Sequence, residues 1–101
     1  MSELLRNPIA LFDVKGKVAV VTGASGAFGS LAARVLAAAG TKLVLAAGKE
    51  QELAAVAKDC GELGAEVVTI ARRPNTEADC EAIMDAGTAK FGRLDILVVG
   101  S

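Results

Sequence analysis

One stretch of this 101-residue chain constrains its fold more than any other: an apolar run that leads directly into a glycine-rich turn. Residues 18–21 are consecutive apolar residues, and Gly23, Gly26 and Gly29 follow them. The apolar run is typical of a buried parallel strand, and the pattern after the turn is helical. Gly23 permits a tight turn, Gly26 lets backbone N–H groups approach a phosphate, and Gly29 lets the helix pack closely on the strand. The sequence therefore predicts a strand, a phosphate-binding loop and the amino end of a helix.

The rest of the chain alternates strand and helix patterns. Predicted strands cover residues 17–22, 42–46, 66–71 and 95–99, and predicted helices cover residues 27–39, 50–63 and 77–90. Strict alternation implies right-handed crossovers and a parallel sheet. We expect an α/β doubly wound, Rossmann-like fold that is partial, with strand order 3-2-1-4. Residues 1–12 are expected to form an N-terminal arm, and residues 13–101 a dinucleotide-binding domain truncated after its fourth strand.

Each predicted helix carries an apolar stripe that we expect to face the sheet. The stripe of the first helix consists of Phe28, Leu31, Ala32, Val35, Leu36 and Ala39. The stripe of the second helix consists of Leu53, Val56, Ala57, Cys60 and Leu63. The stripe of the third helix consists of Cys80, Ile83, Met84, Gly87 and Phe91.

Composition and charge argue against several classes of function. The net charge of −1 gives no electrostatic reason to bind nucleic acid or an acidic membrane surface. No apolar stretch approaches the ~20 residues of a membrane span, and the first residues lack a signal-peptide core, so we expect a cytoplasmic protein. Cys60 and Cys80 stand far apart in a chain without histidine, so we expect no metal site and two reduced core cysteines.

The glycine loop also resembles a family fingerprint. Residues 22–29 read Thr-Gly-Ala-Ser-Gly-Ala-Phe-Gly, which resembles the cofactor-binding loop of the short-chain dehydrogenases/reductases. Residues 12–17 are similar to that family's approach to its first strand, and residues 91–98 to its approach to the fourth strand. The resemblance covers residues 12–101. It implies a homo-oligomeric oxidoreductase that transfers hydride between NAD(P) and an alcohol or carbonyl substrate.

The resemblance implies that this chain forms the cofactor cradle. The predicted pyrophosphate residues are Thr22, Gly23, Ser25, Gly26, Phe28 and Gly29. Lys49 is expected on the ribose side of the site, and Gly100 beneath the ribose. Members of the family use a Tyr as general acid/base, with a Lys and a Ser nearby. The 101 residues contain no Tyr, so we assign no catalytic residue and expect this chain alone to be inactive.

The end of the second predicted strand bears on the choice between NADP and NAD. A carboxylate there would bind the ribose hydroxyls and repel a 2′-phosphate, but this chain has Ala47. Gly48 follows, where the family often has an Arg. Small neutral residues followed by Lys49 tolerate the phosphate and can pair with it, which favours NADP weakly over NAD.

Three further positions depart from the family pattern. Ala27 stands where the single-domain branch has a Gly, and Val99 begins the stretch where the family reads Asn-Asn-Ala-Gly. Arg72 and Arg73 follow the third predicted strand, where the family usually has an Asp that bonds adenine. A guanidinium cannot accept that bond, although it can stack on the ring or meet a phosphate.

Two alternatives stay open. The departures at Ala27, Arg73 and Val99 favour a non-catalytic nucleotide-binding or interaction module, and a methyltransferase on a similar fold also places glycines after its first strand. The residues that follow Ser101 would separate the oxidoreductase from these alternatives, because a Tyr-x-x-x-Lys motif there would identify it.

Overall fold

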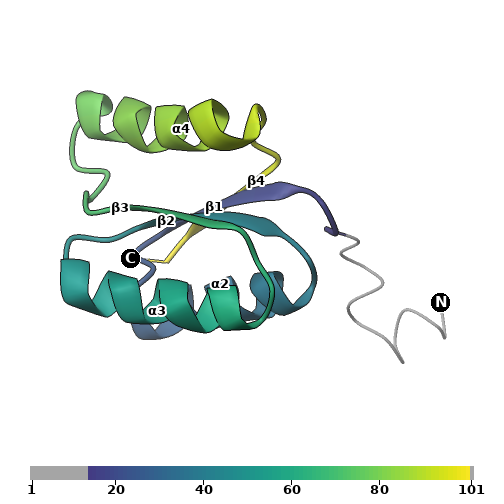
Figure 1. Cartoon of the computed structure of the whole chain (residues 1–101). Helices are drawn as coiled ribbons and strands as arrows, with labels where there is room; N and C mark the ends of the chain where they lie inside the picture. Colours follow the sequence, from purple (N-terminus) through teal and green to yellow (C-terminus); the bar gives the residue numbers. More distant parts are fainter. Residues whose placement is uncertain (1–13, 101) are drawn as a thin grey trace, which may run out of the picture.

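The computed structural model describes residues 14–100 and contains one parallel sheet with helices on both faces (Figure 1). The strands are β1 (Val18–Thr22), β2 (Lys42–Ala46), β3 (Val67–Ile70) and β4 (Ile96–Val99). The helices are α2 (Ala27–Ala38), α3 (Glu50–Glu62) and α4 (Glu77–Phe91). The strand order β3-β2-β1-β4 confirms the predicted Rossmann-like topology. The predicted N-terminal arm lies outside the described residues, among which no helix is long and apolar enough to cross a membrane.

All strand pairs are parallel, so the carboxyl ends of the strands lie at one edge of the sheet. Val20 of β1 aligns with Val44 of β2 on one side and with Leu97 of β4 on the other. Helices α2 and α3 cover one face of the sheet, and α4 covers the other (Figure 1). The loops that leave β1, β2 and β3 therefore open at the same edge, where open α/β sheets bind their ligands.

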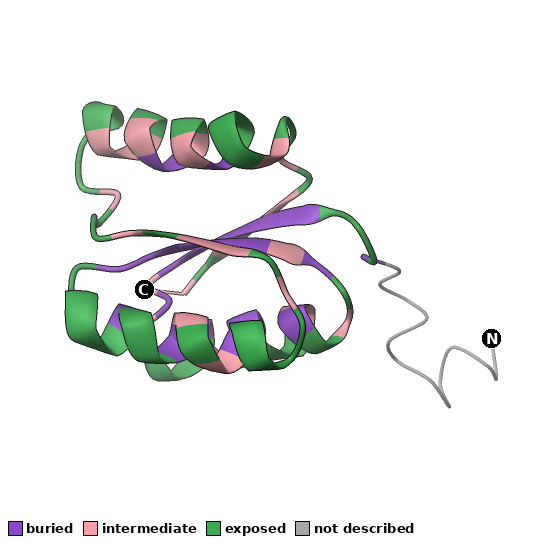
Figure 2. Cartoon of the chain, viewed as in Figure 1, coloured by how far each residue is buried: buried purple, intermediate pink, exposed green. Residues whose placement is uncertain are grey.

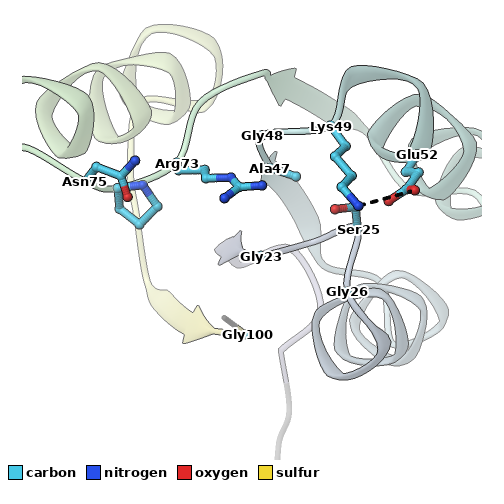
Figure 3. A pocket seen from close by; sticks show the side chains of 11 residues that line it. Gly23, Ser25, Gly26, Ala47, Gly48, Lys49, Glu52, Arg73, Asn75 and Gly100 are labelled. Atoms are coloured by element: carbon cyan, nitrogen blue, oxygen red, sulfur yellow. Dashed lines mark ion pairs between the residues drawn. The ribbon is translucent and has the colours of Figure 1, made fainter.

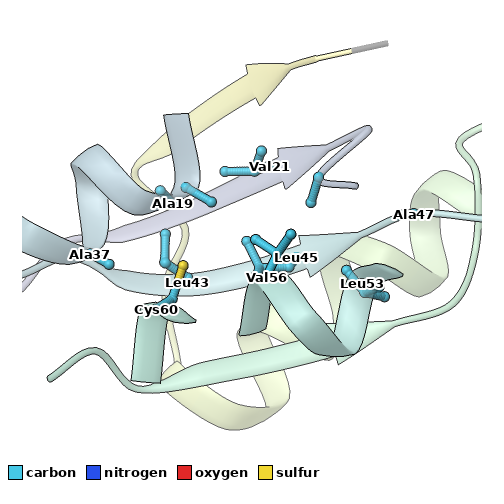
Figure 4. Packing of buried hydrophobic residues seen from close by; sticks show 11 residues of the cluster. Ala19, Val21, Ala37, Leu43, Leu45, Ala47, Leu53, Val56 and Cys60 are labelled. Atoms are coloured by element: carbon cyan, nitrogen blue, oxygen red, sulfur yellow. The ribbon is translucent and has the colours of Figure 1, made fainter. Parts of the chain in front are cut away.

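Both central strands are buried on their two faces, which explains their nearly continuous apolar sequences (Figure 2). Alternate side chains of β1 and β2 enter a cluster under α2 and α3 (Figure 4): Ala19, Val21, Leu43 and Leu45. On the other face, Val18, Val20, Val44 and Ala46 of these strands form a second cluster with Ile83 of α4. Packing on both faces of the sheet thus fixes the strands whose carboxyl ends carry these loops.

The predicted buried face of the first helix, α2, is wrong at three large side chains that are more than half exposed: Phe28 55%, Leu31 62% and Val35 55%. Leu36 of the same stripe is half-buried and packs against the core, as predicted. The helix instead turns its small residues to the sheet: Gly29, Ala33 and Ala37. A Cβ on Gly29 would overlap the carbonyl oxygen of Gly23, so the helix begins too close to the loop for a larger residue. Leu63, the C-cap residue of α3, is also 51% exposed, so its predicted burial is wrong.

Asp95 anchors the amino end of β4 to β1. The Val18 N–H donates to Asp95 Oδ2 at 2.9 Å, and the Asp95 N–H donates to the Val18 carbonyl oxygen at 2.9 Å. Arg93 donates to Asp95 Oδ1 from Nη2 at 2.7 Å and from Nε at 3.2 Å. The hydrogen bonds from Arg93, followed by the one from the Val18 N–H, hold the pKa of Asp95 below its ordinary value.

Candidate functional site

A cavity of about 480 Å³ opens at the carboxyl edge of the sheet (Figure 3). Four segments line it: the loop after β1, the end of β2 with the start of α3, the loop after β3, and the residue after β4. The lining residues are Gly23, Ser25, Gly26, Ala47, Gly48, Lys49, Glu52, Arg73, Pro74, Asn75 and Gly100. The topology therefore brings together residues that are as far apart in the sequence as Gly23 and Gly100.

The glycine loop forms the part of the cavity next to α2. Gly23 has a φ of 63°, in the left-handed region that favours glycine, and the Gly26 N–H donates to its carbonyl oxygen at 3.0 Å. Gly26 is the N-cap residue of α2, with no side chain bonded to the cap and no acidic residue in the first turn. First-turn N–H groups of a helix lack intrahelical partners, and the helix dipole adds positive potential there. The geometry suits an anion such as a phosphate.

Gly100 closes the cavity from the side of β4. Its N–H donates to the Thr22 carbonyl oxygen at 2.9 Å. A Cβ on Gly100 would lie 2.8 Å from the Cα of Gly29 and 2.8 Å from the Thr22 oxygen. The end of β4 thus lies directly against the glycine loop, and only glycine fits there.

The structure brings together five of the eight residues that the sequence predicts to bind the cofactor: Gly23, Ser25, Gly26, Lys49 and Gly100. The other three do not line the cavity. Thr22 is buried, and its Oγ1 donates to the Val98 carbonyl oxygen at 3.5 Å, so this side chain ties β1 to β4. Gly29 is buried against Gly23, and Phe28 is exposed on α2.

Lys49 is not a free cation within the cavity. Its Nζ lies 3.9 Å from Glu52 Oε1, one turn further along α3, and both side chains are more than half exposed (Figure 3). Such an exposed pair contributes little to stability. It does place a carboxylate beside the ammonium group, so Glu52 reduces the net positive charge that Lys49 brings to the site.

The structure places Arg73 in the lining of the cavity. The sequence indicated that a guanidinium here could stack on adenine or meet a phosphate, but Arg73 was not among the predicted cofactor-binding residues. Its side chain extends from the loop after β3 toward Ala47 and lies across Gly48 (Figure 3). In the sequence, Gly48 and Arg73 are two separate departures from the pattern of the family that the chain resembles. The signal that links them is their placement just after neighbouring strands, β2 and β3, which the predicted strand order already puts side by side.

Comparisons with known proteins all point to one family of oxidoreductases. The family described as short chain dehydrogenase matches residues 17–101. An uncharacterized oxidoreductase of Mycobacterium tuberculosis is 41% identical over 93 residues, which make up 92% of this chain and 34% of that protein. The 11-beta-hydroxysteroid dehydrogenase A of Sesamum indicum is 44% identical over 87 residues, 85% of this chain and 25% of that protein. The chain thus spans between 25% and 34% of the length of these two relatives.

A solved structure shows the same arrangement of strands and helices. The short chain dehydrogenase/reductase from Burkholderia phymatum, crystallised in complex with NAD, superposes with a TM-score of 0.81. The sequences are 38% identical, and the match covers 85% of this chain and 31% of that one. Since the family match extends over most of the sequence and the topology agrees with it, the chain belongs to the short-chain dehydrogenase family.

Proposed function

We propose that residues 14–100 hold the adenosine and pyrophosphate part of NAD(P) in an oxidoreductase acting on an alcohol or carbonyl substrate. The observation that carries the proposal is the cavity at the carboxyl ends of the strands, bounded by the glycine loop and the start of α2. Membership of the family supports it, as does the solved relative in complex with NAD. When NAD(P) is bound, its nicotinamide ring accepts or donates the hydride. Residues 14–100 would bind and orient the adenosine and pyrophosphate part that carries this ring.

The loop fits a pyrophosphate in shape and in charge. Gly26 is exposed at the cavity, and a Cβ there would meet only the Gly23 carbonyl oxygen, at 3.4 Å. The loop therefore holds its shape without needing glycine at this position, and the bare backbone leaves room for the ligand. The first turn of α2 presents N–H groups and no carboxylate to an incoming anion.

Within this proposal, NADP is weakly preferred over NAD. Ala47 supplies no carboxylate to hold the ribose hydroxyls or to repel a 2′-phosphate. Two cations, Lys49 and Arg73, line the cavity against one carboxylate, Glu52. The cytoplasmic location and the homo-oligomeric assembly stay predictions from the sequence.

A non-catalytic nucleotide-binding module is the second candidate function. The observation that favours it is Arg73, which stands in the site where an adenine-binding carboxylate is usual in the family. Membership of the short-chain dehydrogenase family argues against the methyltransferase alternative. Reduction of NAD(P) by the full-length gene product with a panel of alcohols separates the enzyme from the module, because a module binds the dinucleotide without turnover.

Gly26→Ala tests the proposed pyrophosphate site in the full-length gene product. We expect the dissociation constant for NADP, measured by calorimetry, to rise about tenfold or more, because the methyl group displaces the phosphate from its N–H donors. The melting temperature should stay unchanged, since the new Cβ makes an ordinary contact at 3.4 Å.

Gly61→Ala is the matched control, because it adds the same methyl group to α3, where nothing lies within 4 Å of the new Cβ. It should leave the affinity for NADP unchanged. Unaltered NADP affinity in Gly26→Ala would overturn the proposed function.

A further inference from the structure

The side chain of Arg73 occupies the space that a side chain at position 48 would need. Strands β2 and β3 are aligned neighbours, and the Ala47 N–H donates to the Ile70 carbonyl oxygen at 3.3 Å. The chain segments that follow the two strands therefore leave the sheet side by side. A Cβ on Gly48 would overlap Arg73 Nε and lie 3.0 Å from its Cγ and Cδ. The absence of a side chain at position 48 is what lets this arginine cross the end of β2.

Arg73 differs from the other cations near the site in its pairing. Lys49 lies beside Glu52, and Arg72 Nη1 donates to Asp79 Oδ1 at 3.4 Å. Among residues 14–100, the structure records no ion pair for Arg73. Its guanidinium is thus the cation in the cavity whose charge no described carboxylate offsets.

The chemistry of a guanidinium without a carboxylate partner points to a phosphate group as its ligand. A guanidinium presents a planar fork of donors that matches phosphate oxygens two at a time, and a phosphate monoester carries close to two negative charges at neutral pH. Resting on the proposed function, we propose that Arg73 binds the 2′-phosphate of the NADP ribose. Gly48, which has no side chain, leaves the room that the Arg73 side chain needs to reach it. The cation for the phosphate then comes from the loop after β3, with Lys49 in a lesser role.

Two other roles for Arg73 make different predictions. A guanidinium stacked on the adenine ring would strengthen NAD and NADP binding alike, because both contain adenine. A side chain that merely fills the cavity would oppose both dinucleotides. Only a bond to the 2′-phosphate distinguishes the two cofactors.

Calorimetry on the full-length gene product with NADP and with NAD tests the assignment. We expect Arg73→Gln to weaken NADP binding about tenfold, the size expected for an exposed charge-assisted contact, and to change NAD binding by less than about twofold. Lys49→Gln, the matched control for loss of one positive charge at the same cavity, should weaken NADP binding by less than about threefold. Adenosine 2′,5′-bisphosphate against 5′-AMP should give the same ranking, without any contribution from the nicotinamide half.

Gly48→Ala tests the spatial part of the proposal. The added methyl group should push the guanidinium aside and weaken NADP binding, with NAD binding and the melting temperature unchanged. In the Arg73→Gln background, Gly48→Ala should have no further effect on NADP binding, because the side chain that it displaces is already gone.

Several outcomes would overturn the assignment. Equal losses for NAD and NADP in Arg73→Gln would identify stacking, and tighter binding of both would identify a cavity-filling role. A larger loss in Lys49→Gln than in Arg73→Gln would move the phosphate to Lys49. Failure of the unmutated protein to bind either dinucleotide would overturn the proposed function, and this assignment with it.

Discussion

At Gly100 and Gly29 the backbones of β4 and α2 meet without room for a side chain. A Cβ on Gly100 would lie 2.8 Å from the Gly29 Cα and 2.8 Å from the Thr22 carbonyl oxygen. Both neighbours are backbone atoms, so no change of rotamer can relieve the contact. The two glycines therefore fix the distance between the fourth strand and the glycine loop.

Gly100→Ala should lower the free energy of unfolding by about 1–3 kcal/mol, the usual cost of overpacking a tight contact. Gly61→Ala should raise it by about 0.5–1 kcal/mol, because Gly61 lies inside α3 with nothing within 4 Å of a new Cβ. Urea denaturation measures both values. Equal stability of Gly100→Ala and the unmutated protein would show that β4 can move away from the loop at little cost.

The sequence predicted some residues of the site and not others, for a physical reason. Gly23 and Gly26 belong to one contiguous loop, whose chemistry can be understood from its own spacing. The contact of Arg73 with Gly48 depends on the alignment of β2 with β3 and on the paths of two loops. Those paths depend on packing, so the sequence showed two unusual residues without showing that they touch.

At the scale of the element, β4 is attached to β1 by a charged residue, Asp95, which directly precedes the strand. Asp95 accepts two hydrogen bonds from Arg93 and one from the Val18 N–H, and all three favour its ionised form. Because the pKa of Asp95 is lowered in the folded state, this carboxylate stabilises the fold at a pH above its ordinary pKa of 3.8. The contribution is lost as the pH falls from that value through the lowered folded pKa.

Asp95→Asn should therefore reduce stability at neutral pH and should flatten the loss of stability on acidification below pH ~4. The asparagine keeps an oxygen for the Val18 N–H but gives up the charge that attracts Arg93. Thermal unfolding followed between acidic and neutral pH checks this. Asp59→Asn is a control, since it removes an exposed surface pair with Arg34 that is remote from β4. A parallel pH dependence in Asp95→Asn and the unmutated protein would contradict the assignment.

The strands and helices follow the predicted pattern closely, and the exception is the rotation of α2. The prediction placed the stripe with the largest side chains against the sheet, as amphipathic patterns usually require. The structure buries Gly29, Ala33 and Ala37 instead, because the helix starts in contact with the glycine loop, where a Cβ on Gly29 would overlap Gly23. Alanine occurs on both faces of this helix, so hydropathy alone could not choose between them.

At the scale of the whole molecule, apolar surface is left uncovered within residues 14–100, and the rotation of α2 accounts for only part of it. The exposed large side chains are Phe28, Leu31 and Val35 on α2, Leu63 after α3, and Leu97 and Val99 on β4. Within the described sheet β4 is an edge strand that pairs only with β1. Edge strands with apolar side chains readily pair with other chains.

A polypeptide of residues 1–101 should therefore self-associate and should not oxidise alcohols. Sedimentation velocity should show oligomers, and Leu97→Lys, which puts a charge on the edge strand, should shift them toward monomer. The absence of Tyr removes a general-acid contribution of about 10²–10⁴-fold. A monomer that reduces NAD(P) with an alcohol would contradict both expectations.

The packing of Arg73 across Gly48 also restricts the order in which mutation can change this pair. An arginine introduced at position 48 while Arg73 is present would push the Arg73 side chain aside and would bring two like charges together, since a Cβ there already overlaps Nε. If Arg73 is replaced first, position 48 becomes free to accept a larger residue. A mutational path from this arrangement to one with the cation at the end of β2 is thus easier when Arg73 is lost first. Under the role proposed for Arg73, the intermediate on that path would discriminate poorly between NADP and NAD.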